Sequence, residues 1–204
     1  MGDMYLFIVG INGSPNKDGN TVFLLKNILE EAQKFGCEYR IINAGEAVLS
    51  SKIPFCAACS TPCSGKCYEG TPLEDAYNII SKADAVILGS PVYFGTVSAQ
   101  LKAFFDKTRK IRGEKLWINK VGAGVTVGAS KYGGQETTLR ALHDIMLVHG
   151  MSIVGDGAGE YDAGHHGVCA QRPVQNDEYA LARAKVLAKR LVDTVHINKN
   201  SPLK

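Results

Sequence analysis

Four cysteine thiols fall within one short stretch of the chain, at Cys56, Cys59, Cys63 and Cys67. Thiolates are soft ligands, and a compact loop can bring four of them around a [4Fe–4S] cluster, whose corner irons each take one thiolate. Zinc also accepts four thiolates, although its structural sites usually combine two Cys-x2-Cys pairs across a longer loop. Free thiols or disulfides are further alternatives, and a reducing compartment disfavours the disulfides. The spacing favours a metal-binding loop without fixing the metal.

The other cysteines and a histidine pair lack such a pattern. Cys37 follows a predicted helix and is expected to be structural, whereas Cys169 lies in an irregular region without an evident partner. His165 and His166 are adjacent in a glycine-rich loop, so we expect them to be exposed rather than to bind a metal.

A second pattern with chemical potential is the glycine- and hydroxyl-rich stretch from Gly10 to Thr21. It lies between an apolar run, residues 5–9, and an amphipathic helical segment. A strand, a loop of this kind and a helix together present free backbone N–H groups and the positive end of a helix dipole at one point. With Ser14 and Asn20 near the helix start, the stretch predicts a phosphate site. An ordinary strand-to-helix turn, which also favours Gly, Asn and Ser, is the alternative.

Several phosphate-binding patterns are excluded. The loop has no closing Gly-Lys-Ser or Gly-Lys-Thr and lacks the G-x-G-x-x-G spacing, so it is neither a Walker A loop nor a dinucleotide fingerprint. A mononucleotide with its phosphate on this loop remains. Two later loops, residues 90–96 and 128–134, offer glycines for close approach and the aromatic side chains of Tyr93 and Phe94 for a flat ring. Plain packing or an interface is the alternative for these two aromatics.

The elements that must position these loops follow an alternating pattern. Five strand-like apolar runs alternate with five helical segments, which predicts an open, doubly wound α/β sheet. The predicted strands are residues 5–9, 38–43, 85–89, 121–127 and 152–155. Loops after the first, third and fourth strands then share one edge of the sheet, where ligands bind in such folds. We predict a single domain over residues 1–197, a Cys-rich insertion at about 44–70, an irregular segment at 156–176 and a flexible tail at 198–204.

Composition excludes several other classes of function. The chain has 204 residues, of which 45% are hydrophobic and 21% charged, as in ordinary globular domains rather than disordered ones. A net charge of +3 spread along the chain gives no support for nucleic-acid binding. No apolar stretch reaches the roughly 18 residues of a membrane span, and no signal peptide is evident. We therefore expect a cytoplasmic protein that contacts no membrane.

Three motifs occur together along the chain: Gly13-Ser14-Pro15 with Asn20-Thr21, then Pro91-Val92-Tyr93-Phe94-Gly95, and then Ser98-Ala99-Gln100-Leu101-Lys102. In combination they resemble the flavodoxin-like NADPH-dependent FMN reductase superfamily. Two more, Gly133-Gly134-Gln135-Glu136 with Thr137 and His149-Gly150-Met151, bring the chain closest to the iron–sulfur flavoproteins. The resemblance extends over about residues 6–157. It implies a three-layer α/β/α sandwich with a five-stranded parallel sheet in the order 2-1-3-4-5 and the Cys-rich insertion after strand 2.

The same resemblance implies an FMN site on these loops. The residues that would hold the phosphate are Ser14, Asn16, Asn20 and Thr21. The residues that would line the isoalloxazine and ribityl are Pro91, Val92, Tyr93, Phe94 and Gly95. The residues that would cover the other edge of the ring are Gly128, Ser130, Tyr132, Gly133 and Gly134.

The resemblance also implies a [4Fe–4S] cluster on Cys56, Cys59, Cys63 and Cys67, although the second gap here has three residues instead of the usual two. It implies a ferredoxin or NAD(P)H as electron donor, a small-molecule acceptor, and a homodimer or homotetramer. The absence of a Ser/His/Asp or Cys/His set fits a site whose chemistry a flavin carries. We therefore expect an FMN-containing oxidoreductase. The alternatives are an NAD(P)H-dependent FMN or quinone reductase without a cluster, and a non-enzymatic flavodoxin-like carrier or redox sensor.

Overall fold

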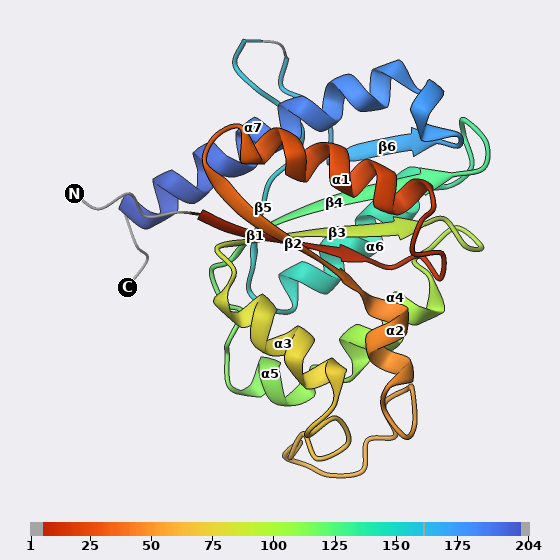
Figure 1. The fold of residues 1–204 in the computed structure, drawn as a ribbon, viewed down its shortest axis with the longest axis vertical. Coiled ribbons are helices and arrows are strands. Elements are labelled where there is room, and N and C mark those ends of the chain that lie inside the picture. The colour runs from red at the N-terminus through yellow and green to blue at the C-terminus, as the bar shows by residue number, and fades with distance from the viewer. Residues whose placement is uncertain (1–5, 161, 201–204) are drawn as a thin grey trace.

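A parallel sheet forms the centre of the protein. The computed structural model describes residues 6–160 and 162–200, and within them six parallel strands run in the order β2-β1-β3-β4-β5, with β6 also paired to β4 (Figure 1). The strands are β1 (Leu6–Asn12), β2 (Cys37–Asn43), β3 (Ala85–Pro91), β4 (Val121–Gly128), β5 (Ser152–Ile153) and β6 (Val168–Gln171). The predicted sheet order is confirmed. Tyr5, which was predicted to begin the first strand, lies outside the described residues.

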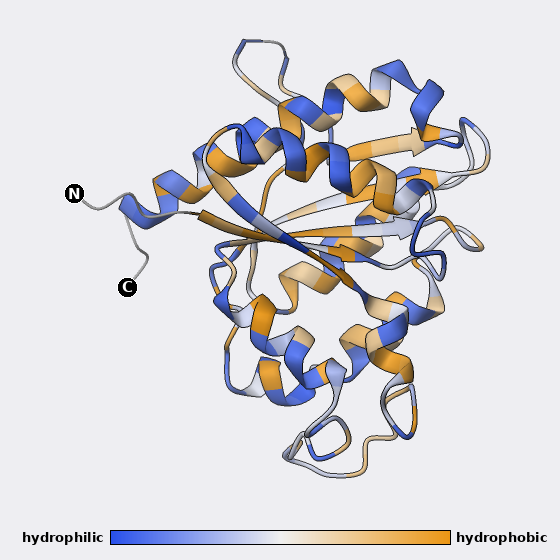
Figure 2. Ribbon diagram, in the orientation of Figure 1, coloured by the Kyte–Doolittle hydropathy of each residue, from blue (hydrophilic) through white to orange (hydrophobic). Residues whose placement is uncertain are grey.

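Helices cover both faces of this sheet, because alternate strand residues point to opposite sides. The helices are α1 (Asn20–Gln33), α2 (Ala44–Leu49), α3 (Pro72–Lys82), α4 (Ala99–Asp106), α5 (Arg109–Gly113), α6 (Gln135–Leu147) and α7 (Glu178–Asn200), with a short 3-10 turn, η1, at Val174–Asn176. Ile8 of β1 joins a core cluster with α1 and α7, whereas Val9 and Ile11 join a second cluster with α2, α3, α4 and α6. Apolar colour in Figure 2 accordingly concentrates on the strands and on the inner sides of the helices.

The fifth position of the sheet differs from the predicted strand. Only Ser152 and Ile153 pair with the start of β4, and the later residues of β4 pair with β6 instead. The segment predicted as irregular thus contains a strand, which its four-residue length and glycine-rich surroundings conceal. The connection between β5 and β6 is tied to α7, because Arg183 Nε donates to Asp156 Oδ2 at 2.6 Å and Nη2 donates to Asp162 Oδ1 at 3.1 Å.

Two further predictions about irregular segments were wrong in part. The start of the Cys-rich insertion forms the short helix α2, with Ala44, Ala47 and Val48 buried. The predicted tail begins too early, because α7 continues to Asn200. Val195 is still buried there, and Lys199 Nζ lies 2.9 Å from Asp84 Oδ1, so the last turns of the helix are held against the sheet. Residues 201–204 of the predicted tail lie outside the described residues. No described helix is both long and apolar enough to span a bilayer.

The strand register brings three loops together. Asn12 at the end of β1 pairs with Gly89 of β3, and Pro91 at the end of β3 pairs with Val127 of β4. The loops that follow β1, β3 and β4 therefore leave the sheet at the same edge, on the right in Figure 1. The Cys-rich segment instead extends below α2 and α3, away from the sheet.

Candidate functional site

The loop after β1 is organised by a buried amide. Asn12 is fully buried, its Oδ1 accepts from the Ser14 N–H at 3.0 Å, and its Nδ2 donates to Asn43 Oδ1 at 3.0 Å. Beyond it, Ser14 Oγ accepts from the Asn16 N–H and Asn16 Oδ1 accepts from the Asp18 N–H. These successive side-chain turns fix the path of the loop without any bound group.

The helix that follows presents an open positive end. No side chain caps α1, and its first turn contains no acidic residue. Its first backbone bond runs from Phe23 N to Gly19 O, so the N–H groups of Asn20, Thr21 and Val22 have no acceptor among the described residues. Asn20 Oδ1 accepts from the Val174 N–H at 2.9 Å, which leaves its amide N–H groups free. Such a helix end has the donors and dipole that bind a phosphate.

The loop after β3 is held by two buried serines. Ser90 Oγ accepts from the Ser98 N–H at 3.1 Å, and Ser98 Oγ donates to the Gly13 carbonyl while accepting from the Leu101 N–H. Ser98 thus caps α4 and also links this loop to the one after β1. Between the serines the chain makes a tight turn in which Tyr93 and Thr96 exchange backbone hydrogen bonds.

The aromatic side chains at the tip of this turn are exposed. Phe94 is fully exposed with a φ of 50°, and Tyr93 is 44% exposed. A bulky side chain with positive φ is uncommon and marks a turn whose surroundings fix its conformation. Plain core packing, the alternative for these two residues, is therefore wrong within this chain.

A second buried amide organises the loop after β4. Gln135 is 5% exposed, its Oε1 accepts from the Gly133 N–H at 2.8 Å, and its Nε2 donates to the Ser130 carbonyl at 2.6 Å. Gly134 caps α6 with a φ of 92°. A Cβ on Gly134 would lie 3.2 Å from Gly95 Cα, so the loops after β3 and β4 approach each other at their glycines.

The structure brings the sequence-predicted residues together around one edge of the sheet. Donors for a phosphate lie at α1, while Tyr93, Phe94 and Tyr132 offer exposed aromatic surface on the two neighbouring loops. Sequence reasoning missed the side chains that support them, namely Asn12, Ser90, Ser98 and Gln135 as structural donors and acceptors. A polar residue directly at the end of an apolar strand or at a helix start was the available signal.

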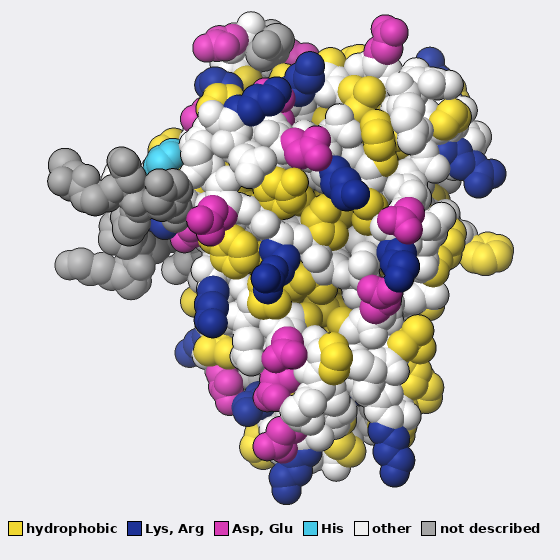
Figure 3. All heavy atoms as spheres, in the orientation of Figure 1, with side chains coloured by type: hydrophobic (Ala, Val, Ile, Leu, Met, Phe, Trp, Pro, Cys, Tyr) yellow, Lys and Arg dark blue, Asp and Glu magenta, His cyan; other side chains and the backbone are white. Residues whose placement is uncertain are grey.

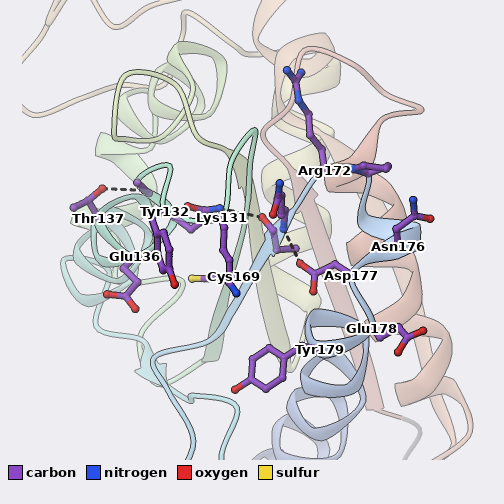
Figure 4. A pocket seen from close by; sticks show the side chains of 15 residues that line it. Lys131, Tyr132, Glu136, Thr137, Cys169, Arg172, Asn176, Asp177, Glu178 and Tyr179 are labelled. Carbon is purple, nitrogen blue, oxygen red and sulfur yellow. Dashed lines mark hydrogen bonds between the residues drawn. The ribbon is translucent and has the colours of Figure 1, made fainter.

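A cavity of about 970 Å³ lies beside these loops, along β6. Figure 4 shows Tyr132 and Glu136 on one side of it, Asp177 and Tyr179 from the start of α7 on the other, and Cys169 in its wall. Neither the loop after β1 nor the loop after β3 lines it. Tyr132 and Gly134, two of the residues predicted to cover one edge of the ring, do line the cavity. Its opposite wall was not predicted, because β6 was not predicted.

The four clustered cysteines lie on the extended segment between α2 and α3. All are free thiols; Cys56 and Cys63 are partly exposed, and Cys59 and Cys67 are exposed. Arg109 Nη2 donates to Thr61 Oγ1 at 3.3 Å and ties this segment to the start of α5. Among residues 6–160 and 162–200, no three His, Cys, Asp or Glu side chains are gathered closely enough to hold a metal ion. Donor type and number fit a four-thiolate cluster, but the thiols are not assembled around one.

One residue packed behind the cysteines has an unpaired buried hydroxyl. Tyr68, next to Cys67, is 3% exposed, and its hydroxyl has no hydrogen-bond partner among the described residues. An unpaired buried hydroxyl is rare, because its desolvation is uncompensated. This donor beside the thiols is an observation in favour of a bound group there.

The family model of the NADPH-dependent FMN reductases matches residues 6–165. The chain belongs to this family. It is 38% identical over 193 residues to an iron–sulfur flavoprotein of Methanocaldococcus jannaschii, covering 94% of this chain and 98% of that protein. It is 34% identical over 197 residues to an iron–sulfur flavoprotein of Methanosarcina thermophila, covering 95% and 97%. The chain is thus a member of the iron–sulfur flavoproteins and a flavin-dependent oxidoreductase.

Other relatives extend this comparison. An NAD(P)H dehydrogenase (quinone) of Chromohalobacter salexigens is 40% identical over 81 residues, or 40% of each chain. Among solved structures, a flavodoxin-type WrbA-like protein of Agrobacterium tumefaciens superposes with a TM-score of 0.67 at 23% identity, covering 95% of this chain and 98% of that one. An archaeal flavodoxin superposes with a TM-score of 0.61 at 14% identity, covering 94% and 99%. These structures confirm the flavodoxin-like fold.

Proposed function

We propose that this member of the family transfers electrons between a donor such as ferredoxin or NAD(P)H and a small-molecule acceptor, using FMN and a [4Fe–4S] cluster. The observation that carries the flavin part is the sheet edge at which three loops converge beside the uncapped end of α1. The cluster part is supported by four free thiols on one loop and by relatives that bear the name iron–sulfur flavoprotein.

The residues of the first loop and of α1 would bind the FMN phosphate. The N–H groups of Asn20 and Thr21 supply donors, the Ser14 hydroxyl proton is free to donate, and the α1 dipole favours the negative charge. Pro91 to Gly95 and Gly128 to Gly134 would orient the flat ring between them and restrict water around it. The flavin, when bound, supplies the hydride and single-electron chemistry, which no described side chain provides.

The four cysteines would each bind one iron through a thiolate. Their exposure allows iron and sulfide to reach the loop from solvent. The loop must close to bring the four sulfurs together. In such sites, part of the free energy of metal binding is used to order the loop that carries the ligands.

The deciding measurement is the flavin, iron and acid-labile sulfide content of protein purified without oxygen. We expect one FMN, four irons and four sulfides per chain, from the chemistry of a single cubane. Replacing Cys59 by Ala should remove the cluster and leave FMN bound. Replacing Cys169 by Ala is the matched control and should leave both. Stoichiometric FMN without iron, even after anaerobic reconstitution with iron and sulfide, would refute the cluster and leave the flavin site intact.

A cluster-free NAD(P)H-dependent FMN or quinone reductase is the second candidate. The observation that favours it is the lack of a gathered thiol set in the described residues, together with similarity to quinone-reducing dehydrogenases. Rapid bleaching of the flavin by NADPH in iron-free protein would support this candidate. No reduction by NADPH, with fast reduction by a reduced ferredoxin, would contradict it.

We also propose a homodimer or homotetramer. Four apolar side chains that are 44–57% exposed lie near the opposite edge of the sheet: Leu116, Ile118, Leu147 and Val148. The face in Figure 3 shows Lys, Arg, Asp and Glu interspersed without a dominant sign, with hydrophobic side chains between them. Light scattering after gel filtration tests this proposal, and a monomer at micromolar concentration would refute it.

A further inference from the structure

The cavity along β6 is large enough for a ligand of its own. Its volume of about 970 Å³ lies within the range in which proteins bind small molecules. The loop after β4 forms one wall, and the end of β6 with the start of α7 forms the other (Figure 4). The predicted phosphate loop and the loop after β3 do not line it. A group bound here would therefore be additional to the FMN proposed above.

Both walls of this cavity are fixed by hydrogen bonds of the fold. Gln135 holds the loop after β4, as described above. On the other side, the Arg172 N–H donates to the Gly128 carbonyl at 2.9 Å, and the Val174 N–H donates to Asn20 Oδ1 at 2.9 Å. The segment between β6 and α7 is thus attached to β4 and to α1. A ligand would find a site that is already formed, so little of its binding free energy is spent on ordering the protein.

Two tyrosine rings reach the cavity from its opposite walls. Tyr132, in the loop after β4, is 92% exposed, and Tyr179, in the first turn of α7, is 63% exposed. In Figure 4 the Lys131 side chain lies between these two rings. Neither ring is used up by packing within the chain, so both offer a face or an edge to a flat aromatic group.

The acidic side chains of the cavity are already compensated. Asp177 Oδ2 accepts from the Gln171 N–H at 2.8 Å, and Asp177 Oδ1 accepts from the Ala180 N–H at 3.0 Å, so this carboxylate caps α7. Glu136 and Glu178 lie in the first turns of α6 and α7, where the positive end of the helix dipole balances their charge.

The basic side chains of the cavity have no such compensation. Lys131 and Arg172 form no ion pair within the described ranges 6–160 and 162–200. Lys131 Nζ lies 5.9 Å from the centre of the Tyr132 ring. Arg172 points away from the two tyrosines in Figure 4, which leaves Lys131 as the cation beside them. An anionic group attached to a flat ring matches this arrangement.

We propose that the cavity binds a planar aromatic carboxylate, with its ring against Tyr132 and Tyr179 and its carboxylate on Lys131 Nζ. The site itself needs neither FMN nor a cluster. Only its position beside the flavin rests on the proposed function, because Tyr132 also belongs to the predicted cover of the ring.

The test uses 2-naphthoate as the probe and Cys169, in the wall of the cavity, as the reporter. Protein saturated with FMN is alkylated with iodoacetamide at alkaline pH, because burial raises the pKa of the Cys169 thiol. Peptide mass spectrometry then gives the rate at each cysteine. We expect millimolar 2-naphthoate to slow alkylation of Cys169 and to leave the exposed Cys59 unchanged as the internal control. No protection of Cys169 would overturn the inference. A chain that takes up no FMN would instead overturn the proposed function, and Cys169 protection can still be measured on it.

Matched ligands and variants test the assigned contacts. Lys131→Gln should weaken 2-naphthoate roughly tenfold and leave the uncharged 2-naphthamide unchanged, since a charge-assisted contact is lost. Lys26→Gln, at an exposed lysine of α1, is the control and should affect neither. Tyr179→Leu should weaken both ligands roughly fivefold. An unchanged affinity of Lys131→Gln for 2-naphthoate would refute the role of Lys131.

A second copy of the chain is the competing occupant of this cavity. Covering by a second copy predicts that Cys169 becomes protected as the protein concentration rises, without any naphthoate. That result would overturn the inference. A Cys169 rate that is independent of protein concentration and falls with added 2-naphthoate would support it.

Discussion

Replacing Asn12 by Ala should weaken FMN binding far more than riboflavin binding. Asn12 does not need to touch the flavin for this effect. Its side chain holds the Ser14 N–H and Asn43 Oδ1 at 3.0 Å each, and so fixes the start of the loop that would carry the phosphate. Riboflavin lacks the phosphate and does not use that loop. A pair of titrations therefore separates loss of the phosphate site from general damage.

The magnitude follows from the bonds that are lost. Each hydrogen bond contributes about 1 kcal/mol net, and leaving buried partners unpaired adds to this, so the variant should lose about 2–3 kcal/mol of unfolding free energy. For a domain of this size that lowers the melting temperature by roughly 5–10 °C. Up to about 2 kcal/mol of it should reappear as the cost of ordering the loop on binding, which corresponds to a roughly 30-fold weaker FMN Kd.

Fluorescence titration of apoprotein with FMN and with riboflavin, alongside thermal unfolding, measures these effects. Asn27→Ala is the matched control, because Asn27 Nδ2 donates to the Phe23 carbonyl at 2.8 Å within α1 and away from the loop. That variant should lose some stability and retain FMN affinity. Equal weakening of FMN and riboflavin by Asn12→Ala, or an unchanged FMN Kd, would refute the assignment of the phosphate to this loop.

Three other substitutions test parts of the structure. Gly134→Ala should cost roughly 1–2 kcal/mol and weaken FMN binding, since Gly134 has a φ of 92°, whereas Gly113→Ala has open space and should change little in the same titrations. Burial, and to a smaller extent the charge of Arg112, lowers the pKa of His149 from 6.5 to about 4. As the pH falls, the imidazole is therefore protonated in the unfolded chain before it is protonated in the folded one. The contribution of the neutral His149 to the free energy of unfolding is fully present above pH 6.5 and should fall by about 3 kcal/mol between pH 6.5 and pH 4. Denaturation curves of His149→Gln over this pH range should lack that decrease. Arg183→Met should cost about 3–5 kcal/mol and speed hydrogen exchange in residues 156–160 and 162–165, because it leaves Asp156, 1% exposed, without the Arg183 ion pair; normal exchange there would contradict this role.

Sequence patterns predicted those elements whose periodicity is long. The strands β1, β3 and β4 and the helices α1, α6 and α7 each repeat their apolar spacing over several residues, and such repeats decide the face that is buried. The strand β6 and the helix α2 were missed because four to six residues carry too little pattern, and their pairing depends on neighbours far away in sequence.

The candidate site also has parts that the sequence predicted and parts that it did not. Position alone predicted the three loops, because any loop after β1, β3 or β4 leaves the sheet at one edge. The positions of Asn12 at a strand end and Gln135 at a helix start indicated a polar role, but their burial and hydrogen bonds were not predicted, since residue type does not reveal whether a polar side chain is enclosed. Strand order and the FMN assignment came from combined motifs and not from any single spacing.

The two cofactor regions differ in how much of their structure the protein supplies by itself. In the loops proposed to bind the flavin, Ser98 joins the loop after β3 to the loop after β1, and Gln135 bonds within the loop after β4 and to Ala170 of β6, so little ordering remains to oppose binding. The cysteine loop has exposed Phe55 and Cys59 and is joined to the body by Arg109. Tyr68 of this segment packs in the core, whereas Cys59 and Cys67 are exposed, so we expect substitutions at these two cysteines to leave the loops proposed to bind the flavin unchanged.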